Sequence, residues 1–353
     1  MKKRILFGVF FAIVVCAFSA PTAKADPANG TLFYTTFGGG QNVWRVDYNY
    51  NGTTFLLTNN TNIASTGGAD GILFDPKGNL IISGQNFNSP PQLHEITTGG
   101  GVVANVSAGT PGTGMGSYHM ALSSTASNAI LYNTWNGPGT GPTSISATVL
   151  SGGGLSVNGV NYTVTANGGT STDVRGVIFD PINSKWYYGT SADGSVVGDF
   201  GTVVFNDVAH TATLTRLLTE VAAHGLSFDP FTNDVIMNSG NTINQFDPTS
   251  GTIVSTKTFG GGQFDQAAED GKGHLFAADN NGHLAFVDYD ATGKIGAGTN
   301  FSAFPFLAST LDDIAPLSGP GSHNEVPEPA TMLLLGSGLI GLVGYGRTRF
   351  IKK

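Results

Sequence analysis

The sequence contains few charged residues. Asp, Glu, Lys and Arg make up 11% of its 353 residues, less than half of the roughly 25% found in an ordinary soluble domain. Acidic residues outnumber basic ones by 24 to 16, so the formal net charge is −8. Proteins that bind nucleic acids usually carry a basic patch. The composition therefore argues against nucleic acid as a main partner.

Cysteine is nearly absent, because Cys16 is the only one. It lies in an apolar run over residues 5–18, after Lys and Arg at positions 2–4 and before the small-residue site Ala23-Lys24-Ala25. This order is typical of a secretory signal peptide, here residues 1–25, and it implies the Sec translocase and signal peptidase as partners. Removing the signal removes the only thiol. The mature protein then has no disulfide, thiol nucleophile or thiolate metal site.

A lipoprotein signal is the alternative interpretation of Cys16. The residue before it, Val15, is branched rather than small, and the apolar run continues past the cysteine. Both features favour the ordinary secretory signal.

The C-terminal residues 326–353 carry the most specific motif of the chain. Pro327, Glu328 and Pro329 precede an apolar stretch over residues 330–346, and a basic tail follows. The length of the apolar stretch is at the lower limit for a membrane span, and the basic tail would lie on the cytoplasmic side. On this argument alone, the segment is a transmembrane tail anchor. A polar stretch over residues 318–325 is the predicted spacer between it and the folded domain.

The same segment resembles the PEP-CTERM sorting signal of Gram-negative bacteria. It has the Pro-Glu-Pro triplet at 327–329, the short Gly-rich span and the basic tail in the expected order. The resemblance implies that an exosortase in the inner membrane recognises the triplet and removes the tail. Export to the cell surface or to an exopolysaccharide matrix would follow.

Residues 26–317 contain an internal repeat. Its strongest copies are Asp70-Gly-Ile-Leu-Phe-Asp75-Pro76, Arg175-Gly-Val-Ile-Phe-Asp180-Pro181 and His224-Gly-Leu-Ser-Phe-Asp229-Pro230, and weaker copies begin at His119 and Asp265. Successive copies begin 41 to 56 residues apart, and each is followed by further short apolar strands. Four short antiparallel strands at this period indicate a blade of a β-propeller. The Asp of each Asp-Pro pair is expected to accept backbone N–H groups further round its turn.

The two ends of the repeat region complement each other. Strands expected at 31–35, 42–46 and 54–58 have no first strand before them, and the apolar segment 310–317 is a first strand without successors. Pairing 310–317 with 31–36 would close an all-β, six-bladed propeller and remove two sheet edges. Seven blades are the alternative, and they would require residues 137–169 to divide into two blades.

Familiar catalytic and metal-binding motifs are missing from the repeat region. The segment from Asp288 to Gly293 resembles the start of an EF-hand loop, but Thr299 stands where that loop needs Glu. A turn between two strands explains the segment better. No Gly-x-Ser-x-Gly elbow occurs, and His94-Glu95 lacks the second His of a zinc helix.

One set of polar residues emerges from the repeat itself. The residue just before each expected first strand is charged or an imidazole, and first strands line the channel of a propeller. Six such residues would ring one channel mouth, with an acidic half and a basic or titratable half. In blade order they are Asp312, Asp70, His119, Arg175, His224 and Asp265.

Two interpretations of this ring remain open. In the first, the polar groups bind channel water and satisfy the strand ends. In the second, Asp70, Asp265 and Asp312 hold a hard cation such as Ca²⁺ through carboxylate oxygens. Three adjacent carboxylates would otherwise repel one another.

The opposite half of the ring has its own predicted roles under the second interpretation. His119 or His224 would serve as a catalytic base or a ligand contact, and Arg175 would bind a carboxylate or similar anion. Because the two imidazoles flank the guanidinium, we expect their pKa values to be lowered.

The phrase from Gly71 to Leu80 is similar to one shared by NHL-type and lactonase or streptogramin-lyase propellers. The resemblance implies the fold alone, because the metal ligands of lactonases have no residue-by-residue match here. Two functions follow. The favoured one is an exported binding or structural module of the cell surface or exopolysaccharide matrix, which is preferred over an enzyme. The alternative is an extracellular, metal-dependent lactonase- or lyase-like enzyme with its site at the channel mouth.

Overall fold

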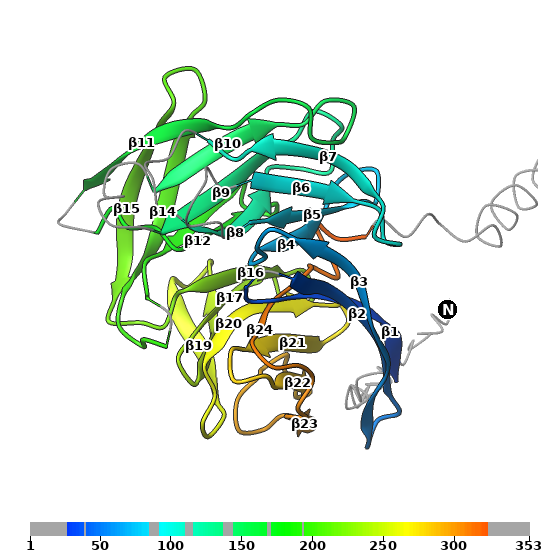
Figure 1. The fold of residues 1–353 in the computed structure, drawn as a ribbon. Coiled ribbons are helices and arrows are strands. Elements are labelled where there is room, and N and C mark those ends of the chain that lie inside the picture. The colour runs from blue at the N-terminus through cyan, green and yellow to red at the C-terminus, as the bar shows by residue number, and fades with distance from the viewer. Residues whose placement is uncertain are drawn as a thin grey trace, which may run out of the picture.

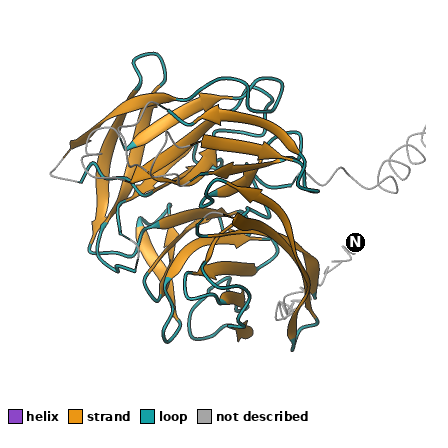
Figure 2. Cartoon of the chain, in the orientation of Figure 1, coloured by secondary structure: helices purple, strands orange, loops and turns teal. Residues whose placement is uncertain are grey.

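The structure, a computed structural model, describes residues 27–38, 40–84, 92–109, 116–136, 144–167, 171–192 and 194–323. Within these ranges every helix or strand assigned is a β-strand (Figure 2), which confirms the all-β prediction. The predicted signal peptide and the sorting segment lie outside the described residues. Among the residues described, no helix is long and apolar enough to cross a membrane.

The strands form four sheets of four strands and one sheet of eight (Figure 1). In each four-stranded sheet, neighbours in the chain pair antiparallel. The first sheet contains β24 (Leu311–Ile314), β1 (Ala28–Thr36), β2 (Gly40–Tyr50) and β3 (Phe55–Thr66). The second sheet contains β4 (Ile72–Phe74), β5 (Leu80–Ser83), β6 (Gln92–Ile96) and β7 (Val102–Ser107). Another contains β16 (Gly225–Asp229), β17 (Asp234–Ser239), β18 (Thr242–Asp247) and β19 (Thr252–Thr258). The last four-stranded sheet contains β20 (Phe264–Glu269), β21 (His274–Asp279), β22 (Leu284–Asp288) and β23 (Phe301–Ala303).

The eight-stranded sheet consists of two antiparallel runs joined at their last strands. The first run is β8 (Gly116–Leu122), β9 (Ile130–Asn136), β10 (Ile145–Val149) and β11 (Val160–Asn167), and the second is β12 (Gly176–Asp180), β13 (Lys185–Gly189), β14 (Asp199–Asn206) and β15 (Thr211–Thr219). Strands β11 and β15 pair in parallel from Thr163 and Thr211 to Asn167 and Thr215. The pairing covers two strand edges that would otherwise be open. Sequence patterns did not predict it.

The described parts of residues 137–169 continue one meander. Strands β10 and β11 pair with each other, and β10 pairs with β9. The division that a seventh blade would require is not seen in these strands.

The two ends of the domain meet in one sheet, as the sequence predicts. Strand β24 pairs antiparallel with β1, with Tyr34 opposite Ile314 and Thr36 opposite Leu311. These four side chains are buried, and all but Thr36 belong to a hydrophobic cluster that also contains Phe286. The cluster joins the first sheet to the sheet of β20–β23.

The Asp-Pro turns form through the predicted hydrogen bonds. Asp75 Oδ1 accepts the amides of Lys77 and Asn79 at 2.8 and 2.9 Å. Asp180 and Asp229 likewise accept the amide two residues later. A carboxylate that accepts such amides holds the turn in place between the first and second strand of the sheet.

Neighbouring sheets are joined by a recurring hydrogen bond beside the channel. A small polar side chain on the second strand of one sheet donates to a backbone oxygen at the start of the next sheet. Thr35 Oγ1 donates to the oxygen of Asp70, and Thr134 Oγ1 to that of Arg175, both at 2.5 Å. Two further joints repeat the arrangement: Ser83 Oγ to Tyr118 O and Asn238 Nδ2 to Asp265 O, each at 2.6 Å.

The glycine that follows the ring residue in the strong copies permits this close approach. A Cβ added at Gly71 would collide with the oxygen of Tyr118, and one at Gly225 with that of Asp265. Gly176 meets the oxygen of His224 in the same way. None of the three has a positive φ. These positions therefore need glycine for space and not for backbone conformation.

The close approach can be tested with Gly225→Ala. The added methyl group would push the sheets apart, so we expect the free energy of unfolding to fall by about 1–3 kcal/mol, as overpacking usually costs. Gly260→Ala is the matched control, because Gly260 is exposed and an added Cβ there has no neighbour within 4 Å. Chemical denaturation of both variants measures the difference. Equal stabilities would contradict the packing argument.

Candidate functional site

The predicted ring residues converge at one end of the first strands. His119, Asp265 and Asp312 lie within β8, β20 and β24, and the other three lie just before β4, β12 and β16. Five of the six are buried. The exception is Arg175, whose side chain is 11% exposed.

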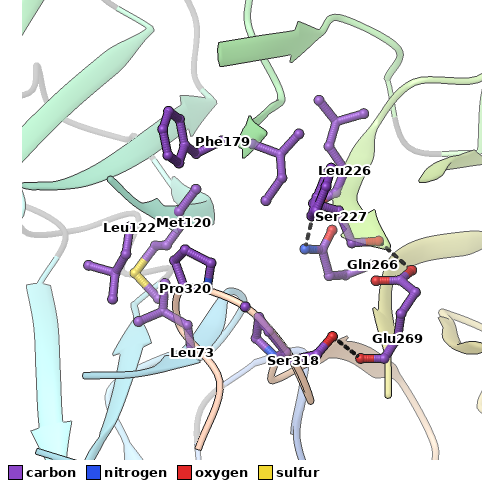
Figure 3. A pocket seen from close by; sticks show the side chains of 15 residues that line it. Leu73, Met120, Leu122, Phe179, Leu226, Ser227, Gln266, Glu269, Ser318 and Pro320 are labelled. Carbon is purple, nitrogen blue, oxygen red and sulfur yellow. Dashed lines mark hydrogen bonds between the residues drawn. The ribbon is translucent and has the colours of Figure 1, made fainter. Parts of the chain in front are cut away.

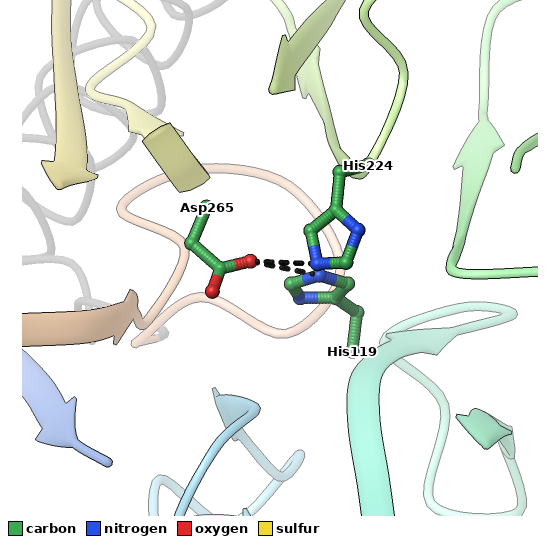
Figure 4. A group of neighbouring side chains, drawn as sticks. All are labelled: His119, His224 and Asp265. Carbon is green, nitrogen blue, oxygen red and sulfur yellow. Dashed lines mark ion pairs between the residues drawn. The ribbon is translucent and has the colours of Figure 1, made fainter. Parts of the chain in front are cut away.

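Both imidazoles contact one carboxylate (Figure 4). His119 Nε2 lies 3.1 Å from Asp265 Oδ1, and His224 Nε2 lies 3.0 Å from the same oxygen. The two rings are nearly perpendicular, with centroids 4.8 Å apart. Side chains of the predicted acidic and basic halves therefore touch, and do not face each other across an open channel.

His224 is oriented by the backbone. Its Nδ1 lies 2.8 Å from the carbonyl oxygen of Ser191. Because a carbonyl oxygen only accepts, this nitrogen carries a proton and donates it. The Nε2 atom is thereby directed toward Asp265.

Asp313 is a member of the cluster that sequence reasoning missed. Its Oδ2 lies 3.0 Å from His119 Nδ1, and its side chain is buried. The position of Asp313 in the repeat could have identified it. Asp313 stands where Gly71, Gly176 and Gly225 stand in the strong copies, so a carboxylate replaces the glycine after a ring residue.

The expected lowering of the histidine pKa values is wrong for His119. Burial lowers the pKa of His119, but the charges of Asp313 and Asp265 outweigh burial and raise it well above its usual value. Conversely, burial would raise the pKa of Asp265, but His224 and His119 hold it well below the usual range. Neighbouring carboxylates decide the charge of His119, and Arg175 does not.

Arg175 lies beside the cluster. Its Nη2 pairs with Asp173 Oδ2 at 2.8 Å, and its guanidinium lies 5.5 Å from the centre of the Tyr118 ring. The same ring contacts both imidazoles. Its role as an anion ligand stays a prediction.

The three predicted metal-binding carboxylates line one cavity. Asp70, Asp265 and Asp312 contribute to a partly open space of about 260 Å³, together with Phe37, Gln263, Asn280, Thr310 and Leu311. Burial, together with the negative charges of Asp70, Asp265 and Asp313, raises the pKa of Asp312 well above its usual value. Carboxyl groups are thus crowded around this cavity, and His119 and His224 contact Asp265 among them.

Ligand atoms also come close together deeper in the cluster. In the described part of the chain, two sets of three residues each offer ligand atoms within 4.8 Å of one another: His119, His224 and Asp265, and Asp70, His119 and Asp313. The set of Asp70, Asp265 and Asp312 is not one of them. To share one cation, these three would need a water molecule that bridges at least one carboxylate to the ion.

The EF-hand-like segment is a turn, as expected. Asp290 Oδ1 accepts the amides of Thr292 and Lys294 at 2.7 and 2.9 Å, between β22 and β23. Its carboxylate is thus used within the turn.

The opposite end of the first strands is closed by the chain itself. Pro320 lies beside Leu73 and Met120 (Figure 3), over a cavity of about 20 Å³, which is room for about one water molecule. Ser318 Oγ donates a hydrogen bond to the backbone oxygen of Glu269 at 2.6 Å. The amide of Phe74 donates to the backbone oxygen of Gly321, also at 2.6 Å. The predicted spacer 318–325 is thus packed on the sheets as far as residue 323.

Comparison with known proteins adds two findings. Residues 325–349 match the PEP-CTERM protein-sorting motif, so the chain carries the predicted sorting signal. The periplasmic gluconolactonase of Pseudomonas aeruginosa has a similar structure, with a TM-score of 0.54 and 14% identity over 81% of this chain and 98% of that chain. This likeness confirms a lactonase-like β-propeller fold and, at such low identity, nothing about activity.

Virginiamycin B lyase from Staphylococcus aureus is similar at a TM-score of 0.46 and 10% identity, over 80% of this chain and 89% of that chain. A TM-score this low does not by itself establish a shared fold. No curated protein sequence matches the chain.

Glu269 lies beneath residues 318–323, which we call the closing segment, and it makes the stability of the fold depend on pH. Burial and the nearby charge of Asp229 raise the pKa of Glu269 to about 8. The unfolded chain releases this proton from its ordinary pKa of 4.5, so stability is lost as the pH rises from there to about 8. We expect Glu269→Gln to be the more stable protein at pH 8.5 by more than about 1 kcal/mol, and to lose that advantage at pH 4.

Urea denaturation at the two pH values measures this effect. Glu220→Gln is the control, because Glu220 is exposed. A Glu269→Gln advantage that is the same at both pH values would show that titration of Glu269 is not its cause.

Proposed function

We propose that this protein is an exported six-bladed propeller that serves as a binding or structural module at the cell surface or in the exopolysaccharide matrix. The observation that carries the proposal is the sorting motif at residues 325–349, which implies export dependent on an exosortase and transit through the inner membrane. A signal peptide at residues 1–25 would direct the chain to the Sec translocase and to signal peptidase.

The strand pairing supports six blades. Four four-stranded sheets and the two halves of the eight-stranded sheet make six meanders. In one of them, β24 supplies the first strand and β1–β3 the others, so that a single sheet joins the two ends of the domain. This closure covers the edge of β1 that would otherwise be open.

The cavity at the channel mouth supports a cation-dependent binding site. Asp70, Asp265 and Asp312 line it, and a divalent cation would relieve the repulsion that these carboxylates exert on one another. Ca²⁺ accepts carboxylate and water oxygens together, so it suits three carboxylates that lie apart. A bound Ca²⁺ with open positions would take acidic groups of an exopolysaccharide as further ligands.

The contacts of the imidazoles favour a binding module over a lactonase- or lyase-like enzyme. His119 and His224 are 1% and 0% exposed, and His119 carries a raised pKa. Both ring nitrogens of His119 already face carboxylates, Nδ1 that of Asp313 and Nε2 that of Asp265, so neither is open to take a proton from a substrate. His224 contacts Ser191 and Asp265, and no part of it lines the cavity.

The sorting proposal predicts a length change in the cell. In a Gram-negative host that has an exosortase, the full chain should be exported and shortened near residues 327–329. A variant with Pro327, Glu328 and Pro329 all changed to Ala should stay full-length in the inner membrane, because the enzyme has no triplet to recognise. Immunoblots of membrane and extracellular fractions measure both. Full-length wild-type protein that persists in the inner membrane would leave only the tail-anchor interpretation.

The cavity proposal predicts a response to Ca²⁺. For the full chain purified in detergent, millimolar Ca²⁺ should raise the melting temperature, because a ligand that binds only the folded state stabilises it. The response should disappear in the Asp70→Asn/Asp312→Asn variant and persist in Glu220→Gln, which removes an exposed carboxylate. A wild type that melts at the same temperature with and without Ca²⁺ would contradict the site.

A further inference from the structure

Three buried side chains direct ligand atoms at one point. His119 Nε2 and His224 Nε2 lie 3.1 and 3.0 Å from Asp265 Oδ1 (Figure 4), and none of the three residues is more than 4% exposed. Their rings are nearly perpendicular, so the two nitrogens approach the oxygen from different directions. The three side chains come from three different four-stranded meanders, whose first strands are β8, β16 and β20.

The positions of the protons leave electron-rich atoms facing each other. His224 donates its Nδ1 proton to Ser191 O. In a neutral ring, Nε2 then has only a lone pair, and that lone pair faces a carboxylate oxygen at 3.0 Å. Such an arrangement is repulsive unless a positive charge lies between the atoms. Either a second proton on the ring or a metal ion supplies that charge.

The outer contacts are those of a metal centre. Metal-binding histidines generally donate their other ring N–H to a carboxylate or a backbone carbonyl, which fixes the tautomer and the ring orientation. Here Asp313 stands behind His119 at 3.0 Å and Ser191 O behind His224 at 2.8 Å. Both imidazoles therefore have the outer partner that a ligating imidazole needs.

We propose that His119, His224 and Asp265 form a binding site for a divalent first-row transition metal, with Zn²⁺ as the probe. Zinc binds imidazole nitrogen and carboxylate oxygen at about 2.0–2.2 Å, so two ligands at angles of about 90–110° lie roughly 2.8–3.6 Å apart. The separations of 3.1 and 3.0 Å between Asp265 Oδ1 and the two imidazole nitrogens fall within this range. Small side-chain movements are enough to admit the ion.

The surroundings provide charge balance and access. Asp313 and Asp312 add buried acidic groups next to the site, which a dication compensates. Asp265 also lines the cavity of about 260 Å³, which gives an entry path and room for a water ligand. The proposal goes beyond the Ca²⁺ site at the mouth, because imidazole nitrogen suits zinc and its neighbours in the periodic table, whereas Ca²⁺ takes oxygen ligands.

Zinc titration of the metal-free full chain tests the proposal. Competition with a chromogenic zinc chelator should show one ion bound per chain at neutral pH. His119→Ala and His224→Ala should each abolish this binding, and Asp313→Asn should weaken it by about 10- to 100-fold, as loss of an outer partner usually does. His94→Ala should bind as the wild type does, because His94 contacts Asn105, outside the cluster. Binding should also fall as the pH is lowered, because protons compete for the imidazoles.

Two further measurements make every outcome decisive. If an alanine variant does not fold, His224→Gln keeps the volume of the ring more closely and is titrated instead, with Co²⁺ as a second probe whose visible spectrum reports imidazole ligation. Asp70→Asn/Asp312→Asn should lose the Ca²⁺ response yet still bind zinc, which separates this site from the proposed function. A folded wild type that does not bind zinc, or histidine variants that bind it equally well, would overturn the proposal and leave doubly protonated imidazoles in the cluster.

Discussion

The close approach of neighbouring sheets beside the channel is the constraint on which the rest of the structure depends. A side chain on one sheet donates to the backbone oxygen of a ring residue on the next, as Thr35 does to Asp70 and Asn238 to Asp265. Glycine at 71, 176 and 225 leaves the space that this contact needs. Because the bonded oxygens belong to the ring residues or their neighbours, the contact that joins the sheets also holds the polar side chains at the channel.

Pairing of carboxylates with imidazoles explains how a chain with so few charges keeps a crowded cluster of ionisable groups buried. Burying a carboxylate or an imidazolium costs free energy unless partners compensate it. Asp265 has two imidazoles within 3.1 Å and Asp313 has one at 3.0 Å, whereas Asp312 is left with carboxylate neighbours that raise its pKa. The carboxyl groups of one cluster are thus compensated to different extents, and both proposed cation sites are built on that difference.

The closing segment connects the fold to sorting. Residues 318–323 pack over the other end of the first strands, and the matched sorting motif begins at residue 325. The sorting signal is therefore attached close to the folded domain. The channel is accessible at the mouth where the charged cluster lies, and the domain's own chain covers the other mouth.

The sequence alone determined the all-β class, the closure of the domain by β24 and β1, the Asp-Pro turns, the six ring positions and the sorting motif. Each of these depends on local chemistry or on the period of the repeat, which a single sequence displays directly. Only the tertiary structure decided that His119 reaches Asp265, that Asp313 joins the cluster, that β11 pairs with β15 and that residues 318–323 pack on the sheets. These contacts depend on how far a side chain or strand reaches across the fold, and the spacing of residues along the chain does not encode that distance.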